Sequence, residues 1–171
     1  ARVSTLVPRP PAWQHVPMPN TKKRQVFEEG HIRKFLVIAD ESAEVEAALY
    51  YAASRSAHTG GAVVLLYVIE PDHQFWGGVR QVQIDEETNK AKALFRLLRR
   101  KLNNAGFEAV VTQEVIQEGQ KVEQIIKLID SDPDIAVMAL GAAADAKGPG
   151  PLVSSLAAGA SAGSFPIPIT I

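Results

Sequence analysis

Short apolar runs, separated by segments of helical periodicity, constrain the fold of this chain more than any other feature. Three of the runs, residues 35–39, 62–69 and 135–140, carry only aliphatic and aromatic side chains or methionine. Runs of this length are too short for a buried helix and are typical of strands that are covered on both faces. Two less uniform runs, 107–116 and 167–171, also indicate strands, and the partial alternation of the first places it near a sheet edge.

The segments between these runs carry apolar residues three and four positions apart, which predicts helices. The first helix follows Ser42, a suitable N-cap, and ends at Gly60-Gly61. The second covers about residues 85–104, with most of its basic residues on the solvated face, and two more cover 119–131 and 151–163. The apolar stripe of the second helix consists of Ala91, Leu94, Leu98, Leu102 and Ala105.

Alternating strands and helices predict the fold class. Parallel neighbours in a sheet need crossover connections, and the helices supply them. We therefore expect an α/β fold in which a five-stranded parallel sheet carries helices on both faces. Ligands of such sheets bind beyond the carboxyl ends of the strands, so the loops after Ala39, Ile69 and Leu140 are the first places to search.

The first 33 residues differ in composition from the rest of the chain. Five of the 11 prolines lie within the first 19 residues, and each proline removes a backbone donor that helices and sheets need. Six basic and two acidic residues give residues 1–33 a net charge of +4, which leaves −5 for residues 34–171. We expect an extended, proline-rich basic arm at 1–33 and one α/β domain at 34–171.

The composition excludes several classes of function. The chain has no cysteine, which removes disulfides, thiol nucleophiles and thiolate metal sites. Its net charge of −1 gives no strong field toward nucleic acid, and no apolar stretch approaches the roughly 18 residues of a membrane helix. The first residues lack the apolar core of a secretory signal, so we expect a cytoplasmic protein without nucleic-acid or membrane partners.

Motifs of common enzymes are missing. Lys147-Gly148 has the reverse of the P-loop order, and Asp40-Glu41-Ser42 occupies the turn where a dinucleotide fingerprint begins. Asp130, Asp132 and Asp134 alternate as in a metal-binding loop, but the proline between them favours a turn from helix to strand. Because no nucleophile with a recognisable base emerges, we expect no enzymatic activity.

Four stretches that follow one another in the order of the predicted strands resemble the universal stress protein family. The resemblance covers residues 34–171 and leaves out the arm. It implies a sheet with strand order 3-2-1-4-5 and a homodimer formed through the last strand, and it implies ATP binding in some members only. The four stretches are Ala39-Asp40-Glu41-Ser42, Leu65-Leu66-Tyr67-Val68-Ile69-Glu70-Pro71, Val137-Met138-Ala139-Leu140-Gly141 and Phe165-Pro166-Ile167-Pro168-Ile169.

The resemblance also implies a set of nucleotide-binding residues. An aspartate after the first strand, in contact with the ribose or the metal–phosphate region, corresponds to Asp40, with Ser42 in the same turn. A valine whose backbone meets adenine corresponds to Val68. The phosphate loop, Gly-x2-Gly-x9-Gly followed by Ser or Thr, falls on Gly141, Ala144, Ser154 and Ser155.

This chain keeps one glycine of the three in that loop. Phosphate oxygens are held by successive backbone N–H groups and a helix N-terminus, which glycine leaves sterically open. Ala144 adds a methyl group, Ser154 adds more, and Asp145 brings a negative charge. We therefore expect binding of ATP with Mg²⁺ to be weak or absent. Taken alone, Asp40 is also a common turn residue and Val68 a core residue.

Three functions follow from the sequence. The first is a non-catalytic, dimeric stress-response protein of this family with weak or absent nucleotide binding. The second is an ATP-binding switch, in which the nucleotide orders residues 142–152. The third is an interaction module that works through the arm, where Trp13 lies between Pro10-Pro11 and Pro17; a mobile tail is the alternative to that reading.

Overall fold

The computed structural model describes residues 24–74, 76–143, 150–161 and 165–171. Residues 1–23 of the predicted arm and Ala144 lie outside the described residues. The elements are β1 (Lys34–Ile38), α1 (Val45–Thr59), β2 (Ala62–Ile69), α2 (Gly77–Asn104), β3 (Val111–Glu118), α3 (Lys121–Ser131), β4 (Ile135–Ala139), α4 (Pro151–Ser161) and β5 (Ile169–Thr170).

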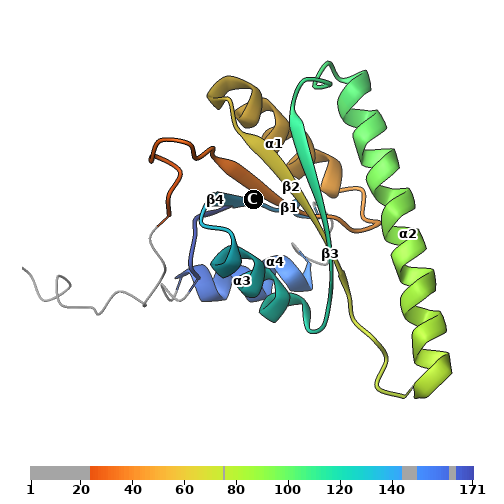
Figure 1. Cartoon of the computed structure of the whole chain (residues 1–171). Helices are drawn as coiled ribbons and strands as arrows, with labels where there is room; N and C mark the ends of the chain where they lie inside the picture. Colours follow the sequence, from red (N-terminus) through yellow and green to blue (C-terminus); the bar gives the residue numbers. More distant parts are fainter. Residues whose placement is uncertain (1–23, 75, 144–149, 162–164) are drawn as a thin grey trace, which may run out of the picture.

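The strands form one parallel sheet in the order β3-β2-β1-β4-β5, which confirms the predicted fold class (Figure 1). Every residue of β2 is buried, because β1 and β3 flank it and helices cover both of its faces. The predicted division into an arm at 1–33 and a domain at 34–171 stays a prediction.

Two hydrophobic clusters lie on opposite faces of the sheet, because successive strand residues point to opposite sides. Val63, Leu65 and Tyr67 of β2 pack with α1 and α2. Val64, Leu66 and Val68 pack with α3 and α4. Both faces of the sheet are therefore closed, and the ends of the strands are left to form sites.

Helix α2 is longer than its sequence pattern indicates. It begins at Gly77, eight residues before the predicted start, and Figure 1 shows its yellow-green first half standing clear of the sheet. Apolar periodicity appears where a helix is covered, and residues 77–82 are all exposed, so this stretch gave no such signal. Within the covered half, the buried residues are Ala91, Phe95, Leu98 and Leu102, and Phe95 was missing from the predicted stripe.

Other predicted boundaries were also wrong, and the last strand, predicted at 167–171, contains only Ile169–Thr170. Strand β3 begins at Val111 and not at Phe107, because the N–H of Phe107 donates to Leu102 and closes the end of α2. Helix α1 has Glu44, and not the predicted Ser42, in the N-cap position. Ser42 lies three residues before Val45 and donates its hydroxyl to Asp40.

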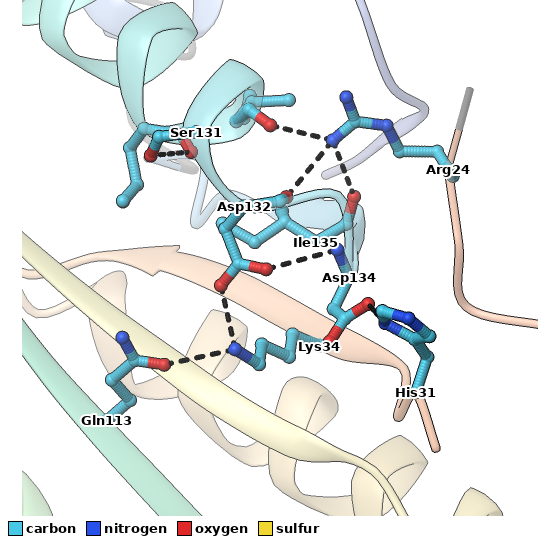
Figure 2. A network of polar contacts seen from close by, with 10 residues as sticks. Arg24, His31, Lys34, Gln113, Ser131, Asp132, Asp134 and Ile135 are labelled. Carbon is cyan, nitrogen blue, oxygen red and sulfur yellow. Dashed lines mark hydrogen bonds and ion pairs between the residues drawn. The ribbon is translucent and has the colours of Figure 1, made fainter. Parts of the chain in front are cut away.

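Residues 24–33 lie against the connection between α3 and β4 (Figure 2). The guanidinium of Arg24 donates to the carbonyls of Ile129 at 2.7 Å, Asp132 at 3.2 Å and Ile135 at 3.4 Å. A cation on the last carbonyls of a helix is favourable, because those carbonyls have no partner within the helix. The end of the predicted arm is thus fixed to the domain at the C-terminus of α3.

Side-chain contacts also join residues 31–34 to the turn between α3 and β4. The ammonium of Lys34 lies 2.7 Å from Asp132 and donates to Gln113 at 3.3 Å, and His31 lies 2.6 Å from Asp134 (Figure 2). These two carboxylates serve the turn from helix to strand, as their sequence pattern predicted. Among the residues that the structure describes, no group of acidic or histidine side chains is arranged to hold a metal ion.

Candidate functional site

The turn after β1 holds the first predicted site residues. Asp40 Oδ1 accepts hydrogen bonds from the backbone N–H of Ser42 at 2.9 Å and from its hydroxyl at 2.5 Å. A carboxylate that binds the N–H two residues on closes an Asx-turn. Asp40 is therefore a turn residue, and it also lies at the point where the winding of the sheet reverses between β1 and β4.

A pocket of about 210 Å³ opens beside this turn, at the carboxyl ends of β1 and β4. Asp40, Ser42 and Gly141 line it, so three of the predicted residues come together. Lys121 and the first residues of α4, Pro151 to Val153, also line it. The lining therefore combines an aspartate with a lysine and the positive end of the α4 dipole.

Lys121 was missed by the sequence analysis. It is the first residue of α3, where a cation opposes the helix dipole, and helices ordinarily place acidic residues there. Its ammonium lies 4.0 Å from Glu70, a weak and exposed pair. A lysine in the first turn of a helix that follows a parallel strand was the available sequence signal.

Val68 does not line the pocket. It is 9% exposed and packs in the cluster under α3 and α4. The last paired residue of β1 is Ile38, opposite Leu66, and the N–H of Ala39 donates to Leu66 at 2.8 Å. Val68 of β2 thus lies two residues past the last residue that pairs with β1, and its backbone on that side has no pairing residue of β1 beside it.

Gly141 has a structural reason to be glycine. A Cβ built on it would lie 2.0 Å from the carbonyl oxygen of Glu44, which is far inside van der Waals contact. The end of β4 therefore passes directly against the residue that precedes α1. This close approach requires glycine whether or not a phosphate binds beside it.

The last two predicted residues lie on α4, away from the pocket lining. The N–H and the hydroxyl of Ser154 both donate to the carbonyl of Gly150, at 3.0 Å and 2.9 Å. Ser155 is exposed on the same helix. The donors of Ser154 are consequently engaged in the first turn of α4.

These contacts test whether the described residues fit the triphosphate of ATP. The resemblance places Ser154 at the third glycine of the phosphate loop, but its N–H donates to Gly150 in the first turn of the helix, and Pro151, three residues earlier, has no N–H. The described part of the loop does not fit a triphosphate held in the way that the resemblance implies. Asp40, Lys121 and the start of α4 fit a hydroxyl-bearing ligand with one anionic group.

The Asp40 turn is also connected to α2 by a chain of polar contacts. The hydroxyl of Tyr67 donates to Glu87 at 2.7 Å, and Lys90 lies 3.9 Å from Glu87 and 3.2 Å from Glu41. Burial, and then the hydrogen bond to Glu87, raise the pKa of the Tyr67 phenol well above its ordinary value. The hydrogen bond to Glu41 raises the pKa of Lys90.

A second pocket, of about 480 Å³, lies on the other side of the same turn, toward α2. Its floor is apolar, with Leu94, Leu97 and Leu98 of α2, and an ion pair between Lys101 and Glu46 crosses its rim. Lys101 belongs to the helix face that was predicted to be solvated. Residues of the Asp40 turn therefore line two pockets, and the ion pair between Glu41 and Lys90 joins the turn to α2.

Comparison with known proteins gives one family. The model of the universal stress protein family matches residues 31–157. No curated protein matches the sequence.

Solved structures match over most of the chain. The universal stress protein UspA of Lactobacillus plantarum has a TM-score of 0.64 and 18% identity, over 82% of this chain and 97% of its own. A universal stress protein in complex with cAMP has a TM-score of 0.57 and 17% identity, over 81% and 97%. A family member of Arabidopsis thaliana with AMP bound has a TM-score of 0.54 and 14% identity, over 81% and 89%. At these identities the likeness shows the fold.

Proposed function

The chain belongs to the universal stress protein family, and from this premise we propose that it is a non-catalytic, dimer-forming stress-response protein in which nucleotide binding is weak or absent. The single observation that carries the proposal is the engagement of Ser154. Its N–H donates to Gly150 inside α4, so it is not directed to a phosphate. Anion sites built from backbone donors tolerate few missing donors.

The size of the pocket supports the same proposal. The pocket that reaches from Asp40 to the start of α4 has about 210 Å³, below the roughly 300–1,000 Å³ that is usual for ligand pockets, and the pocket of about 480 Å³ at the same turn lies toward α2. The turn that would contact a ribose is already closed by the hydrogen bonds of Asp40 to Ser42.

A second candidate, a nucleotide-dependent switch, is favoured by Lys121. Its ammonium and the N-terminus of α4 line the pocket, and this pair suits a single phosphate better than a triphosphate. The ligands of two structural relatives, AMP and cAMP, have one phosphate group each. Slow hydrolysis of ATP would accompany such a switch only if the full phosphate chain were held.

Isothermal titration separates the two candidates. We expect no heat of binding, or millimolar affinity, for ATP with Mg²⁺ and for AMP. Micromolar affinity that Asp40→Ala abolishes, and that the control Asp85→Ala on exposed α2 leaves unchanged, establishes the switch and rejects the first candidate. Micromolar binding of AMP but not of ATP identifies the single-phosphate form of the switch.

We propose the homodimer at the β5 edge. β5 contains only Ile169 and Thr170 and pairs with β4 on one side. Ile171 is 61% exposed and Tyr51 is 42% exposed, and both line a pocket of about 320 Å³ beside this edge. Exposed apolar side chains at a sheet edge favour pairing with another chain.

Sedimentation velocity tests the dimer. We expect wild type to sediment as a dimer and Ile171→Asp as a monomer, because a carboxylate at the interface is left without a partner. The control is Val82→Asp, a similarly exposed residue on α2. A dimer that survives Ile171→Asp and dissociates with Val82→Asp places the interface on α2.

The proposal also places the protein in the cytoplasm, which is supported by the absence of cysteine from the sequence. None of the helices within the described residues has the length and apolar character that crossing a bilayer requires. Partners other than a second copy of the chain are limited in this proposal to those of the N-terminal arm.

A further inference from the structure

A pocket of about 860 Å³ lies outside the candidate nucleotide site. It opens at the carboxyl ends of β2 and β3, beside the uncovered start of α2, and we call it the α2 groove. Its lining includes Glu70, Asp72, His73, Trp76, Arg80 and Glu118.

An exposed tryptophan stands at the edge of the α2 groove. Trp76 is the N-cap residue of α2 and is 82% exposed. Val79 and Val82 continue along the helix at intervals of three and are 59% and 56% exposed. Flat aromatic surfaces of this kind are the platforms on which polyproline II segments dock.

The charge of the α2 groove is acidic. Glu118 pairs with Arg80 at 2.5 Å, and Glu70 lies 4.0 Å from Lys121. Asp72 accepts a hydrogen bond from the N–H of Gln74 and forms no ion pair with any residue of the described part of the chain. The groove therefore combines an aromatic platform with a carboxylate that is open to a cation.

The chain itself contains a matching segment. Residues 1–23 carry four basic residues and no acidic one, and they include the stretch Pro8-Arg9-Pro10-Pro11. This stretch has the spacing Pro-x-x-Pro with an arginine inside it, which is the composition of ligands for aromatic grooves. We propose that residues 8–11 dock in the α2 groove of the same chain, with prolines on Trp76 and Arg9 paired with Asp72.

The connection is long enough for docking within one molecule. Arg24 is bound at the C-terminus of α3, and Gln120, which precedes the N-terminus of α3, lines the groove. The 11 residues of α3 span about 16 Å at 1.5 Å per residue. The 12 residues between Pro11 and Arg24 reach up to about 40 Å when extended. A tether of this length holds the segment at millimolar effective concentration.

Quenching of Trp76 fluorescence by acrylamide tests the proposal in the full-length chain. The chain has two tryptophans, so Trp13→Phe leaves Trp76 as the single reporter. In that background, replacing Pro8, Pro10 and Pro11 by alanine uncovers the indole. If docking at millimolar effective concentration fills about half of the grooves, the quenching constant rises about twofold. Replacing Pro17 and Pro19 by alanine is the matched control and leaves it unchanged.

A charge exchange identifies the partner of Arg9. We expect Arg9→Asp and Asp72→Arg each to raise the quenching constant, and the double variant to restore the wild-type value. An unchanged constant in the triple proline variant overturns the proposal. A constant that rises on dilution of the wild-type protein also overturns it, because the docked segment then comes from a second copy.

Discussion

The two ends of the sheet are built in opposite ways. At the end where the strands begin, Arg24, Lys34 and Asp132 join segments that are about 100 residues apart in sequence. At the end where the strands finish, three pockets open around Asp40 and α2, and the ion pairs that cross them are exposed. Around β1 and β4, the end at which the strands begin is closed by polar contacts, and the opposite end is open.

The difference shows that the two ends of a parallel sheet have different roles: one end stabilises the fold, and the loops at the other end are free to form binding sites. All strands start at the same end, so contacts there fix the arrangement of the whole sheet. The loops at the opposite end connect strands to helices, and they change with little cost to the fold. Residues that bind a ligand therefore concentrate at the open end, where Asp40, Lys121 and Trp76 lie.

The largest loss of stability is expected at Gly141, where the open end of the sheet is tightly packed. Gly141→Ala places a Cβ 2.0 Å from the carbonyl oxygen of Glu44, and backbone must move to relieve it. We expect a loss of about 3 kcal/mol in the free energy of unfolding, measured in urea. The control is Gly78→Ala, whose Cβ meets nothing within 4 Å and which lies in the first turn of α2. A loss in Gly141→Ala no larger than the control's change would show that the two segments do not approach so closely.

The second prediction compares ion pairs at the two ends. Asp132→Ala removes the partner of Lys34 where both side chains are 18% exposed. We expect a loss of about 2 kcal/mol, because the ammonium stays largely buried without its counter-charge. Glu118→Ala removes the exposed partner of Arg80 at the open end, where solvent screens the pair, and costs at most about 0.5 kcal/mol. Equal losses in urea unfolding would contradict the distinction between the ends.

The third prediction uses pH to measure burial at the open end. The phenol of Tyr67 ionises near pH 10 in the unfolded chain, but burial and Glu87 raise its pKa in the folded protein. Above about pH 10 the unfolded state therefore loses a proton that the folded state keeps, and the folded protein loses stability as pH rises. Between pH 10 and 11 we expect wild type to lose up to about 1.4 kcal/mol more than Tyr67→Phe. Parallel stability curves for the two proteins would show that Tyr67 is not held in its protonated form.

The fold was predictable because its signals are local and repeated. The all-apolar runs of β1, β2 and β4 indicate strands that are covered on both faces, and the intervening helices require parallel pairing. The strand order came from the resemblance, since periodicity alone does not order strands. Residues 77–84 at the start of α2 were missed, because a helical segment that is largely exposed has no apolar stripe.

The candidate site was predictable only in part, because contacts between distant segments leave no periodic pattern. Asp40 was found from its place after a buried strand. The reason why residue 141 must be glycine could not be predicted, since Glu44, the residue that a Cβ would meet, is nearly 100 residues away in sequence. The contacts of Arg24 and His31 at the closed end were likewise invisible, because their partners lie on another loop.

The smallest expected effect concerns the residue that carries the proposed function. Ser154→Gly restores the third glycine of the phosphate loop. It costs about 0.5 kcal/mol of stability, because glycine is a poorer helix former than serine. The N–H of residue 154 still donates to Gly150, and Pro151 still lacks a donor.

We therefore expect the affinity for ATP to change less than about threefold, which corresponds to about 0.6 kcal/mol. The measurement is the titration with ATP and Mg²⁺ described above, with Ser155→Gly as the neighbouring control on the same helix. If Ser154→Gly alone produced micromolar binding, the side chain at this position would be the barrier, and the engagement of its N–H within α4 would be irrelevant. A small effect places the barrier in the helix itself, since α4 then bonds internally the backbone donor that a phosphate would need.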